Sequence, residues 1–326
     1  MRTIILMILL FYQNIFSQEV FPVEIPLNGE AKDRDLEFSG LTWYKENLIL
    51  LPQYVKKEDP GFYTISKKDL INWIVANQEK AIKPKKIKIE LSDIREKIEG
   101  FQGFEAITFI GNKAYMIIES KNNGIMKSFL IKGKLNFRKL KLVIDSKIIK
   151  EIPLPVNIKN MGFESILKYQ HDLMVLYEAN GENINNNPLA LTYNSSLKPK
   201  NSITFPNLEY RLTDVTELDS KNNFWAINYF WPGEKERLNP GKDLIIEDIK
   251  EGMTHKRYEH VERLVEFKID SNKLIRTSTP PIQLVLEEKS RNWEGLVRFE
   301  DKGFLMIVDE HPRTLLAFIP KPQSYK

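Results

Sequence analysis

The chain has 326 residues, of which 42% are hydrophobic, so it can fill the core of one large domain or two ordinary ones. Its 48 basic and 44 acidic residues nearly balance, and no Lys/Arg run is interleaved with aromatics, which argues against nucleic-acid binding. Cysteine is absent, which excludes disulfides, thiolate catalysis and thiolate metal sites.

The first 18 residues, MRTIILMILLFYQNIFSQ, combine one positive residue, Arg2, with an apolar run from Ile4 to Tyr12 and a polar end at Ser17. A membrane span needs about 20 apolar residues, so the run predicts a secretory signal peptide cleaved near Ser17 or Gln18. A buried N-terminal strand is the alternative. We expect residues 19–326 to form one mature domain, monomeric and without a membrane span, that is periplasmic or secreted.

Five related segments then follow along the chain. Each has an apolar residue, usually a carboxylate, a small residue and an aliphatic one, then a short polar turn and a mostly apolar strand. They are FSGLTWYKENLILLPQY from Phe38, FEAITFIGNKAYMIIES from Phe104, FESILKYQHDLMVLYEANG from Phe163, LTDVTELDSKNNFWAINYF from Leu212 and WEGLVRFEDKGFLMIVDEHP from Trp293. Such internal repetition is typical of propellers.

Each of the first four units continues with two further alternating runs, such as FYTISKK and KKIKIEL, so four strands a unit are expected. Short helices are expected near Lys67 to Asn77 and near Ser92 to Ile98. The last unit is one strand short, and the segment EVFPVEIPL, residues 19–27, can supply that strand. This would close the ring of blades and remove an open sheet edge.

The pattern therefore predicts an all-β, five-bladed β-propeller closed by the N-terminal strand. A sixth blade drawn from the long interval after Asp214 is one alternative, and a pair of β-sandwiches is another. A sandwich pair gives no reason for a carboxylate that recurs at one register.

The innermost strands of a propeller line its channel, so the equivalent residues should form a ring. We assign this first ring to Ser39, Glu105, Glu164, Asp214 and Glu294. Crowded carboxylates raise one another's pKa, and a hard cation that prefers oxygen ligands, Ca²⁺ or else Mg²⁺, would neutralise them. In the alternative, the carboxylates cap backbone N–H groups or pair with Arg211 and Arg298.

A second polar ring is expected where the second strand of each unit ends. Its members are Gln53, Glu119, Glu178, Asn228 and Asp309. Because antiparallel strands return to the same end, both rings should meet at one mouth. His311 and Arg313 follow Asp309 and are candidates for a general acid/base and an anion clamp, although His311 could equally be a surface side chain. The insertion that carries His255, Lys256, Arg257 and His260 is either a lid or a charged surface loop.

The repeated motif [FW]-E-[GAS]-[IL], which begins at Phe104, Phe163 and Trp293, resembles the exported bacterial propellers called phytase-like, or "esterase-like activity of phytase". This resemblance implies a hydrolase of phosphate esters or other esters. On this reading the first ring and Glu119 would hold the ion, while Glu178, Asp309, His311 and Arg313 would serve catalysis. The chain departs from the motif at Ser39 and in the Thr-Asp-Val of the fourth repeat.

A different class of function is also open, namely a non-catalytic propeller that binds a glycan, a peptide or an envelope partner through the same face. The sequence contains no Gly-x-Ser-x-Gly elbow, P-loop, dinucleotide fingerprint or His-Glu-x-x-His motif, so it does not favour serine hydrolases, kinases or zincins.

Overall fold

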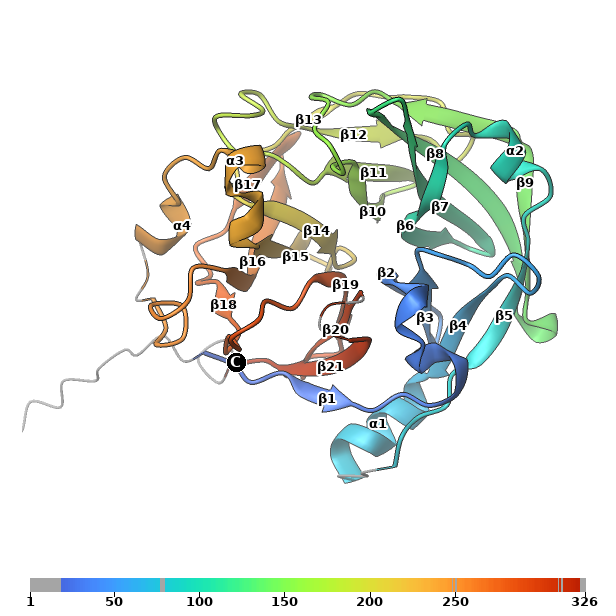
Figure 1. The fold of residues 1–326 in the computed structure, drawn as a ribbon, viewed down its shortest axis with the longest axis horizontal. Coiled ribbons are helices and arrows are strands. Elements are labelled where there is room, and N and C mark those ends of the chain that lie inside the picture. The colour runs from blue at the N-terminus through green and yellow to red at the C-terminus, as the bar shows by residue number, and fades with distance from the viewer. Residues whose placement is uncertain are drawn as a thin grey trace, which may run out of the picture.

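The computed structural model describes residues 19–76, 80–247, 249, 251–309, 311 and 313–322. The predicted signal peptide, residues 1–18, lies outside the described residues. The described chain forms five four-stranded blades around a common centre, which confirms the predicted five-bladed propeller (Figure 1). Neither a sixth blade nor a pair of sandwiches is formed by these residues.

In every blade the first strand lies at the centre and the later strands follow outward (Figure 1). The first blade contains β2 (Phe38–Tyr44), β3 (Asn47–Pro52), β4 (Gly61–Ser66) and β5 (Lys85–Glu90). The second contains β6 (Phe101–Ile110), β7 (Lys113–Asn122), β8 (Ile125–Asn136) and β9 (Lys141–Ile152). The third contains β10 (Phe163–Tyr169), β11 (Asp172–Tyr177), β12 (Leu189–Tyr193) and β13 (Ile203–Thr204). The fourth contains β14 (Arg211–Val215), β15 (Asn223–Phe230), β16 (Val261–Asp270) and β17 (Lys273–Arg276), and β18 (Ile282–Gln283) also pairs with β16.

The fifth blade joins the two ends of the described chain. It contains β19 (Trp293–Phe299), β20 (Gly303–Val308), β21 (Leu315–Pro320) and, as its outer strand, β1 (Val23–Ile25). Strand β1 is antiparallel to β21, with Ile25 opposite Leu316. The prediction that residues 19–27 supply the missing strand is thus confirmed, and the edge of β21 is covered.

The core is divided into five hydrophobic clusters among the described residues, each between two neighbouring blades. The apolar residue that begins each repeat belongs to a different cluster and is at most 1% exposed; these residues are Phe38, Phe104, Phe163, Leu212 and Trp293. The repeat therefore specifies one interblade core for each of its copies, which explains why a large apolar side chain recurs at this position.

The residue after each of these apolar side chains interrupts the pairing with the second strand. In the third blade, for example, Phe163 pairs with Tyr177 and Ser165 with Leu176, which leaves Glu164 in a bulge. The other four inner strands shift register at the corresponding place. A bulge re-aims a side chain, and here it directs the second residue of the repeat toward the channel.

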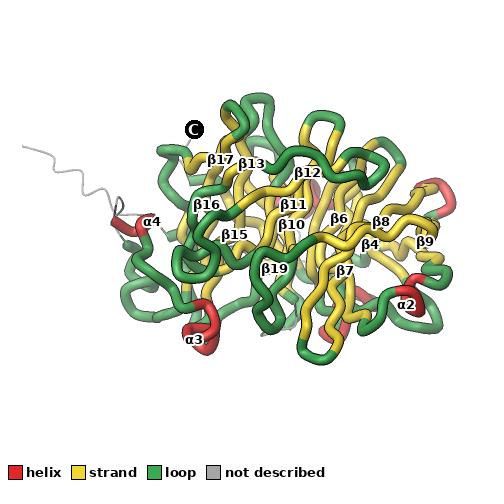
Figure 2. The backbone as a smooth tube through the Cα atoms, turned by 90° about the horizontal axis from the view of Figure 1, so that it is seen from above, coloured by secondary structure: helices red, strands yellow, loops and turns green. Residues whose placement is uncertain are grey.

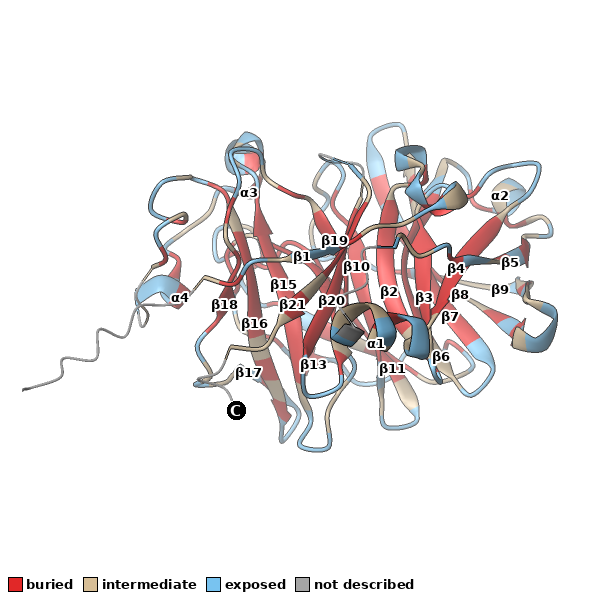
Figure 3. Cartoon of the chain, turned by 90° about the horizontal axis from the view of Figure 1, so that it is seen from below, coloured by how far each residue is buried: buried red, intermediate tan, exposed pale blue. Residues whose placement is uncertain are grey.

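Helices and loops cover the surface of the propeller (Figures 2 and 3). Helix α1 (Lys67–Ala76) lies where a helix was predicted, and Ser66 Oγ accepts the N–H of Asp69 at its start. Helix α2 (Ile94–Lys97) is shorter than predicted. The remaining helical turns are η1 (Gly29–Lys32), η2 (Arg34–Leu36), η3 (Phe137–Lys139), η4 (Pro232–Glu234), α3 (Lys235–Leu238) and α4 (Leu244–Glu247). No described helix is long and apolar enough to span a membrane.

Candidate active site

The side chains at the bulges converge at one mouth of the channel, as predicted. A cavity of about 290 Å³ is lined there by Ser39, Glu105, Glu164 and Glu294 of the first ring, together with Gln53, Glu119 and Asp309 of the second. The two remaining members of the second ring, Glu178 and Asn228, are fully buried beside Arg211. The described structure thus brings the two predicted rings together.

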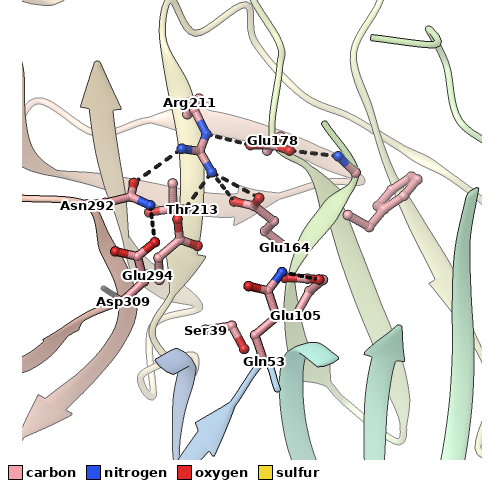
Figure 4. A network of polar contacts seen from close by, with 12 residues as sticks. Ser39, Gln53, Glu105, Glu164, Glu178, Arg211, Thr213, Asn292, Glu294 and Asp309 are labelled. Carbon is pink, nitrogen blue, oxygen red and sulfur yellow. Dashed lines mark hydrogen bonds and ion pairs between the residues drawn. The ribbon is translucent and has the colours of Figure 1, made fainter. Parts of the chain in front are cut away.

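The guanidinium group of Arg211 lies among these carboxylates (Figure 4). Its Nε donates to Glu178 Oε2 at 2.6 Å. Its Nη2 donates to both oxygens of Glu164, at 3.0 and 3.1 Å, and to Glu294 Oε1 at 3.3 Å, while Nη1 donates to Asn292 Oδ1 at 3.2 Å. For Glu164 and Glu294 the structure therefore shows the alternative in which the carboxylates pair with Arg211.

Burial raises the pKa of Glu164, Glu178 and Glu294, although the positive charge of Arg211 acts in the opposite direction. Burial would lower the pKa of Arg211, but the surrounding carboxylates outweigh this and raise it. Arg211 therefore stays positive. The charges of neighbouring carboxylates also raise the pKa of Glu164 and Glu294.

Glu105 and Ser39 lie on the side of the cavity away from Arg211 (Figure 4). Gln53 Nε2 donates to Glu105 Oε1 at 2.9 Å, and burial together with the charge of Glu119 raises the pKa of Glu105. Ser39 Oγ donates to the carbonyl oxygen of Phe104 at 2.5 Å. The hydroxyl of Ser39 thus joins the first and second inner strands.

Glu119, at the end of β7, is the carboxyl group of the cavity without a hydrogen-bond partner among the described residues. Burial raises its pKa to about 8, and the charge of Glu178 adds to this effect. Gly162 packs against it, since a Cβ atom at residue 162 would lie 2.7 Å from Glu119 Oε1. At neutral pH Glu119 is therefore protonated, and its carboxyl group makes no hydrogen bond with another described residue.

Asp309 has the opposite surroundings. Asn292 Nδ2 donates to Asp309 Oδ2 at 2.7 Å, and the backbone N–H of His311 donates to Asp309 Oδ1 at 2.9 Å. Two N–H donors stabilise the ionised carboxylate. Because Asn292 also accepts from Arg211, it connects Asp309 to the central cation. The His311 side chain is exposed at the rim and faces a neighbouring groove.

In the fourth repeat, Thr213 and not Asp214 directly follows the apolar residue that begins the unit. The buried Leu212 pairs with Asn228, and the register shifts between Leu212 and Val215. Thr213 Oγ1 donates to the carbonyl oxygen of Trp293 at 2.6 Å and so connects the fourth and fifth blades. The hydroxyl of Ser39 connects the first and second blades in the same way. The ring position of the fourth blade is thus a hydroxyl.

Asp214 is therefore not at the predicted ring position and does not line the cavity, and its role as a metal ligand stays a prediction. It lies one residue further along β14, where its carboxylate accepts the backbone N–H groups of Val215 at 2.8 Å and Leu296 at 2.7 Å. This is the other alternative that the sequence left open, a carboxylate that caps backbone N–H groups and connects neighbouring blades.

Arg313 does not serve as the predicted anion clamp, because it lies outside the cavity. Its guanidinium group pairs with Glu24 of β1, with Nη2 at 2.6 Å from Oε2. The pair is exposed and joins the N-terminal strand to the last blade. The side chain of Arg313 is thus directed toward the outer strand of the blade and not toward the channel.

The described carboxylates do not fit the predicted Ca²⁺ ring. Among the described residues, no three His, Asp or Glu side chains are arranged so that they could hold a metal ion. The physical reason is that N–H groups of Arg211, Gln53 and the backbone already occupy oxygens of Glu105, Glu164 and Asp214. Binding of Ca²⁺ or Mg²⁺ stays a prediction from the sequence.

The position directly before each repeat was missed as a source of site residues. In the fourth and fifth blades it carries Arg211 and Asn292, the two residues that organise the carboxylates. In the third blade it is Gly162, whose missing side chain leaves room for Glu119. A signal was present in the sequence, since the basic residue Arg211 directly precedes the fourth repeat.

The insertion of the fourth blade borders a second groove. His255 is buried, with Nδ1 at 2.9 Å from Glu19 Oε1, whereas Lys256 and Arg257 are exposed. His260 lines a groove of about 470 Å³ next to the acidic cavity. The insertion thus forms a side wall of this groove.

No protein-family model matches the chain, and a search of curated proteins found no match either. Solved structures share its fold. A candidate glycoside hydrolase from Parabacteroides distasonis is 11% identical, with a TM-score of 0.51 over 94% of both chains. The catalytic domain of a Coprinopsis cinerea GH62 α-L-arabinofuranosidase is 8% identical, with a TM-score of 0.50 over 94% of this chain and 98% of that domain. At these identities the likeness concerns the fold.

Proposed function

We propose that this propeller is a hydrolase that cleaves a glycosidic bond in a neutral carbohydrate, with Glu119 as general acid and Asp309 as general base. The observation that carries the proposal is the contrast between these two carboxyl groups in one cavity. Burial holds a proton on Glu119, while two N–H donors stabilise the charge on Asp309. A carboxyl group that keeps its proton can act as a general acid, and a carboxylate held by two N–H donors can take a proton from water.

In this mechanism Glu119 gives its proton to the glycosidic oxygen as the bond between that oxygen and the anomeric carbon breaks. Asp309 removes a proton from a water molecule whose oxygen bonds to the anomeric carbon. Glu119 ends ionised and Asp309 ends protonated, and exchange with solvent restores both. Arg211 positions Asp309 through Asn292 and holds the buried carboxylates in place.

The charge of the cavity favours a neutral substrate. Carboxyl groups outnumber basic side chains in its lining, so an anion would be repelled. The guanidinium nitrogens of Arg211 already donate to protein acceptors, which leaves this residue no role as a phosphate clamp. Two structures of the same fold are described as a candidate glycoside hydrolase and an arabinofuranosidase, which adds support from analogy.

Hydrolysis of an ester or phosphate ester, as the phytase-like resemblance implies, is the second candidate. It would use the same carboxyl groups, and the predicted cation would have to offset their charge. The third candidate is a binding protein without turnover, for a glycan or an envelope partner. Export of the protein is part of all three proposals and rests on the sequence of residues 1–18.

A substrate panel tests the proposal. Wild-type protein is assayed with 4-nitrophenyl glycosides, 4-nitrophenyl acetate and 4-nitrophenyl phosphate, each with and without EDTA. We expect EDTA-insensitive release from at least one glycoside. Glu119→Gln should lose this activity, and its matched control is Glu217→Gln. Glu217 follows β14 at the opposite end of the channel, and burial raises its pKa as well. Turnover of the phosphate alone, or of no compound, would contradict the proposal.

A further inference from the structure

Beside the acidic cavity lies the groove of about 470 Å³, which has a different lining. Its walls carry two aromatic side chains, Tyr229 and Trp231, as well as His260, Lys289 and Ser290. Tyr229 is buried and its hydroxyl bonds with Ser290 Oγ at 3.2 Å. The acidic cavity is polar throughout, so this groove supplies the apolar surface that the cavity lacks.

Trp231 is the exposed aromatic surface of the groove. Trp231 is 51% exposed, although tryptophan has a large apolar side chain. The indole ring rests on Gly233, because a Cβ atom at residue 233 would lie 2.4 Å from Trp231 Cη2. The backbone of Gly233 thus supports the ring and fixes its position at the groove. A half-exposed, supported aromatic ring can stack on a flat apolar ligand face.

Two buried polar atoms of the groove have no hydrogen-bond partner among the described residues. They are His260 Nε2 and Glu234 Oε2, and both side chains are more than nine-tenths buried. His260 Nε2 can donate or accept, depending on the tautomer of the ring, and it lies 3.9 Å from Glu262 Oε1. Burial lowers the pKa of His260 and favours the neutral imidazole.

Unsatisfied buried polar atoms are costly unless a ligand satisfies them. Glu234 Oε2 accepts a hydrogen bond, and His260 Nε2 accepts or donates according to its tautomer, so the matching ligand carries groups that can do both. Hydroxyl groups fit, whereas an ammonium ligand would meet Arg211 and Lys289, which line the same groove. An aromatic surface next to these two polar atoms matches a sugar ring, which has an apolar face and hydroxyl groups at its edge.

The groove adjoins the acidic cavity, since Arg211, Glu234 and Asn292 line both. A ligand that occupies both must extend from the cavity past Glu234 toward Trp231.

We infer that the groove is a second sugar-binding subsite, which holds a ring stacked on Trp231 with hydroxyl groups on His260 Nε2 and Glu234 Oε2. The inference rests on the proposed function and deepens it: the substrate is an oligosaccharide, with one ring in the acidic cavity and the next in the groove. The ring in the groove provides binding energy remote from the bond that is cleaved.

The test compares disaccharides with their monosaccharides by isothermal titration calorimetry. The ligands are arabinobiose, xylobiose, mannobiose and cellobiose, and the protein carries Glu119→Gln so that bound sugars are not cleaved. We expect at least one disaccharide to bind about tenfold more tightly than its monosaccharide. Adding Trp231→Ala should abolish this difference and leave the affinity for the monosaccharide unchanged.

Three further variants separate the loss of ligand contacts from a loss of folding. Gly233→Ala keeps the indole ring but displaces it, so this variant should also weaken disaccharide binding, as Trp231→Ala does. His260→Gln should also weaken it, while His171→Gln, in the exposed turn between β10 and β11, should not. Circular dichroism and thermal midpoints confirm that each variant is folded.

The outcomes distinguish this inference from the proposed function. If wild type hydrolyses glycosides but disaccharide affinity is the same with and without Trp231, or no disaccharide binds more tightly than its monosaccharide, the subsite is overturned and the hydrolase stands. If disaccharides bind in a Trp231-dependent way but no glycoside is cleaved, the subsite stands and the hydrolase is overturned.

Discussion

Arg211 Nε donates to Glu178 Oε2 at 2.6 Å, and the Glu178 side chain is completely buried. The two residues belong to neighbouring blades, at the start of β14 and just after β11. Gly162 N–H donates to the other oxygen of Glu178 at 2.7 Å. The pair brings the positive charge of Arg211 into direct contact with the buried carboxylates of the channel, and the arrangement of the site depends on it.

Replacing Arg211 should lower the free energy of unfolding more than replacing a residue of an exposed ion pair. Arg211→Met leaves buried carboxylates without their cation, so we expect the free energy of unfolding to fall by about 3–5 kcal/mol in urea denaturation at neutral pH. Arg313→Met removes the exposed pair with Glu24 and should change it by about 0–1 kcal/mol. Equal losses in the two variants would show that Arg211 does not stabilise the centre.

Two glycines at the same position of the repeat should respond differently to alanine. A Cβ atom at Gly295 would lie 2.6 Å from Ile307 Cγ2 and 2.9 Å from the backbone N of Leu41, whereas at Gly40 the nearest atom is Leu51 Cδ2 at 3.5 Å. Gly295→Ala should therefore lower the free energy of unfolding by about 1–3 kcal/mol, and Gly40→Ala by less than about 0.5 kcal/mol. A reversed order would contradict the packing at the channel.

Calcium should not be needed for folding, because Arg211 supplies a positive charge and N–H groups occupy oxygens of Glu164 and Glu178. We expect no heat of Ca²⁺ binding in calorimetry at millimolar metal, and no change of the thermal midpoint with EDTA. Binding that disappears in Glu105→Gln or Glu164→Gln would contradict this expectation and support the Ca²⁺ ring predicted from the sequence.

The architecture could be predicted because each feature repeats. A large apolar residue such as Phe163 begins each unit and fills one interblade core, and the missing strand of the last unit pointed to the segment around Val23. The meeting of Glu105 and Glu119 at one mouth followed from the antiparallel order of strands. Features that every blade shares are therefore visible in the sequence.

Features that belong to one blade were harder to predict. Asp214 was predicted as the ring residue because it is acidic. The ring position is set by the register of the strand, and Thr213 occupies it. The central place of Arg211 depends on a position outside the repeat. Arg313 is close to Asp309 in sequence, yet it pairs with Glu24 of the outer strand. The spacing of residues along the sequence does not show in which direction their side chains point.

The pH dependence of catalysis tests the central claim, that Glu119 is the proton donor. The pKa of Glu119 is raised from 4.5 to about 8, so the group is protonated below that pH and loses its proton above it. We therefore predict that kcat/KM on a responsive glycoside falls as the pH rises through about 8. The same shift predicts that stability is lost as the pH rises from about 4.5 to about 8, because the unfolded chain releases the Glu119 proton before the folded protein does. Glu119→Gln should therefore stabilise the protein increasingly over this range and not below about pH 4.5.

The most direct measurement is the pH profile of kcat in Glu119→Gln beside wild type and Glu217→Gln. The account predicts that Glu119→Gln lowers kcat by about 100- to 10,000-fold and removes the alkaline fall, while Glu217→Gln retains both the rate and the profile. A Glu119→Gln enzyme with a wild-type rate, or with the alkaline fall intact, would contradict it.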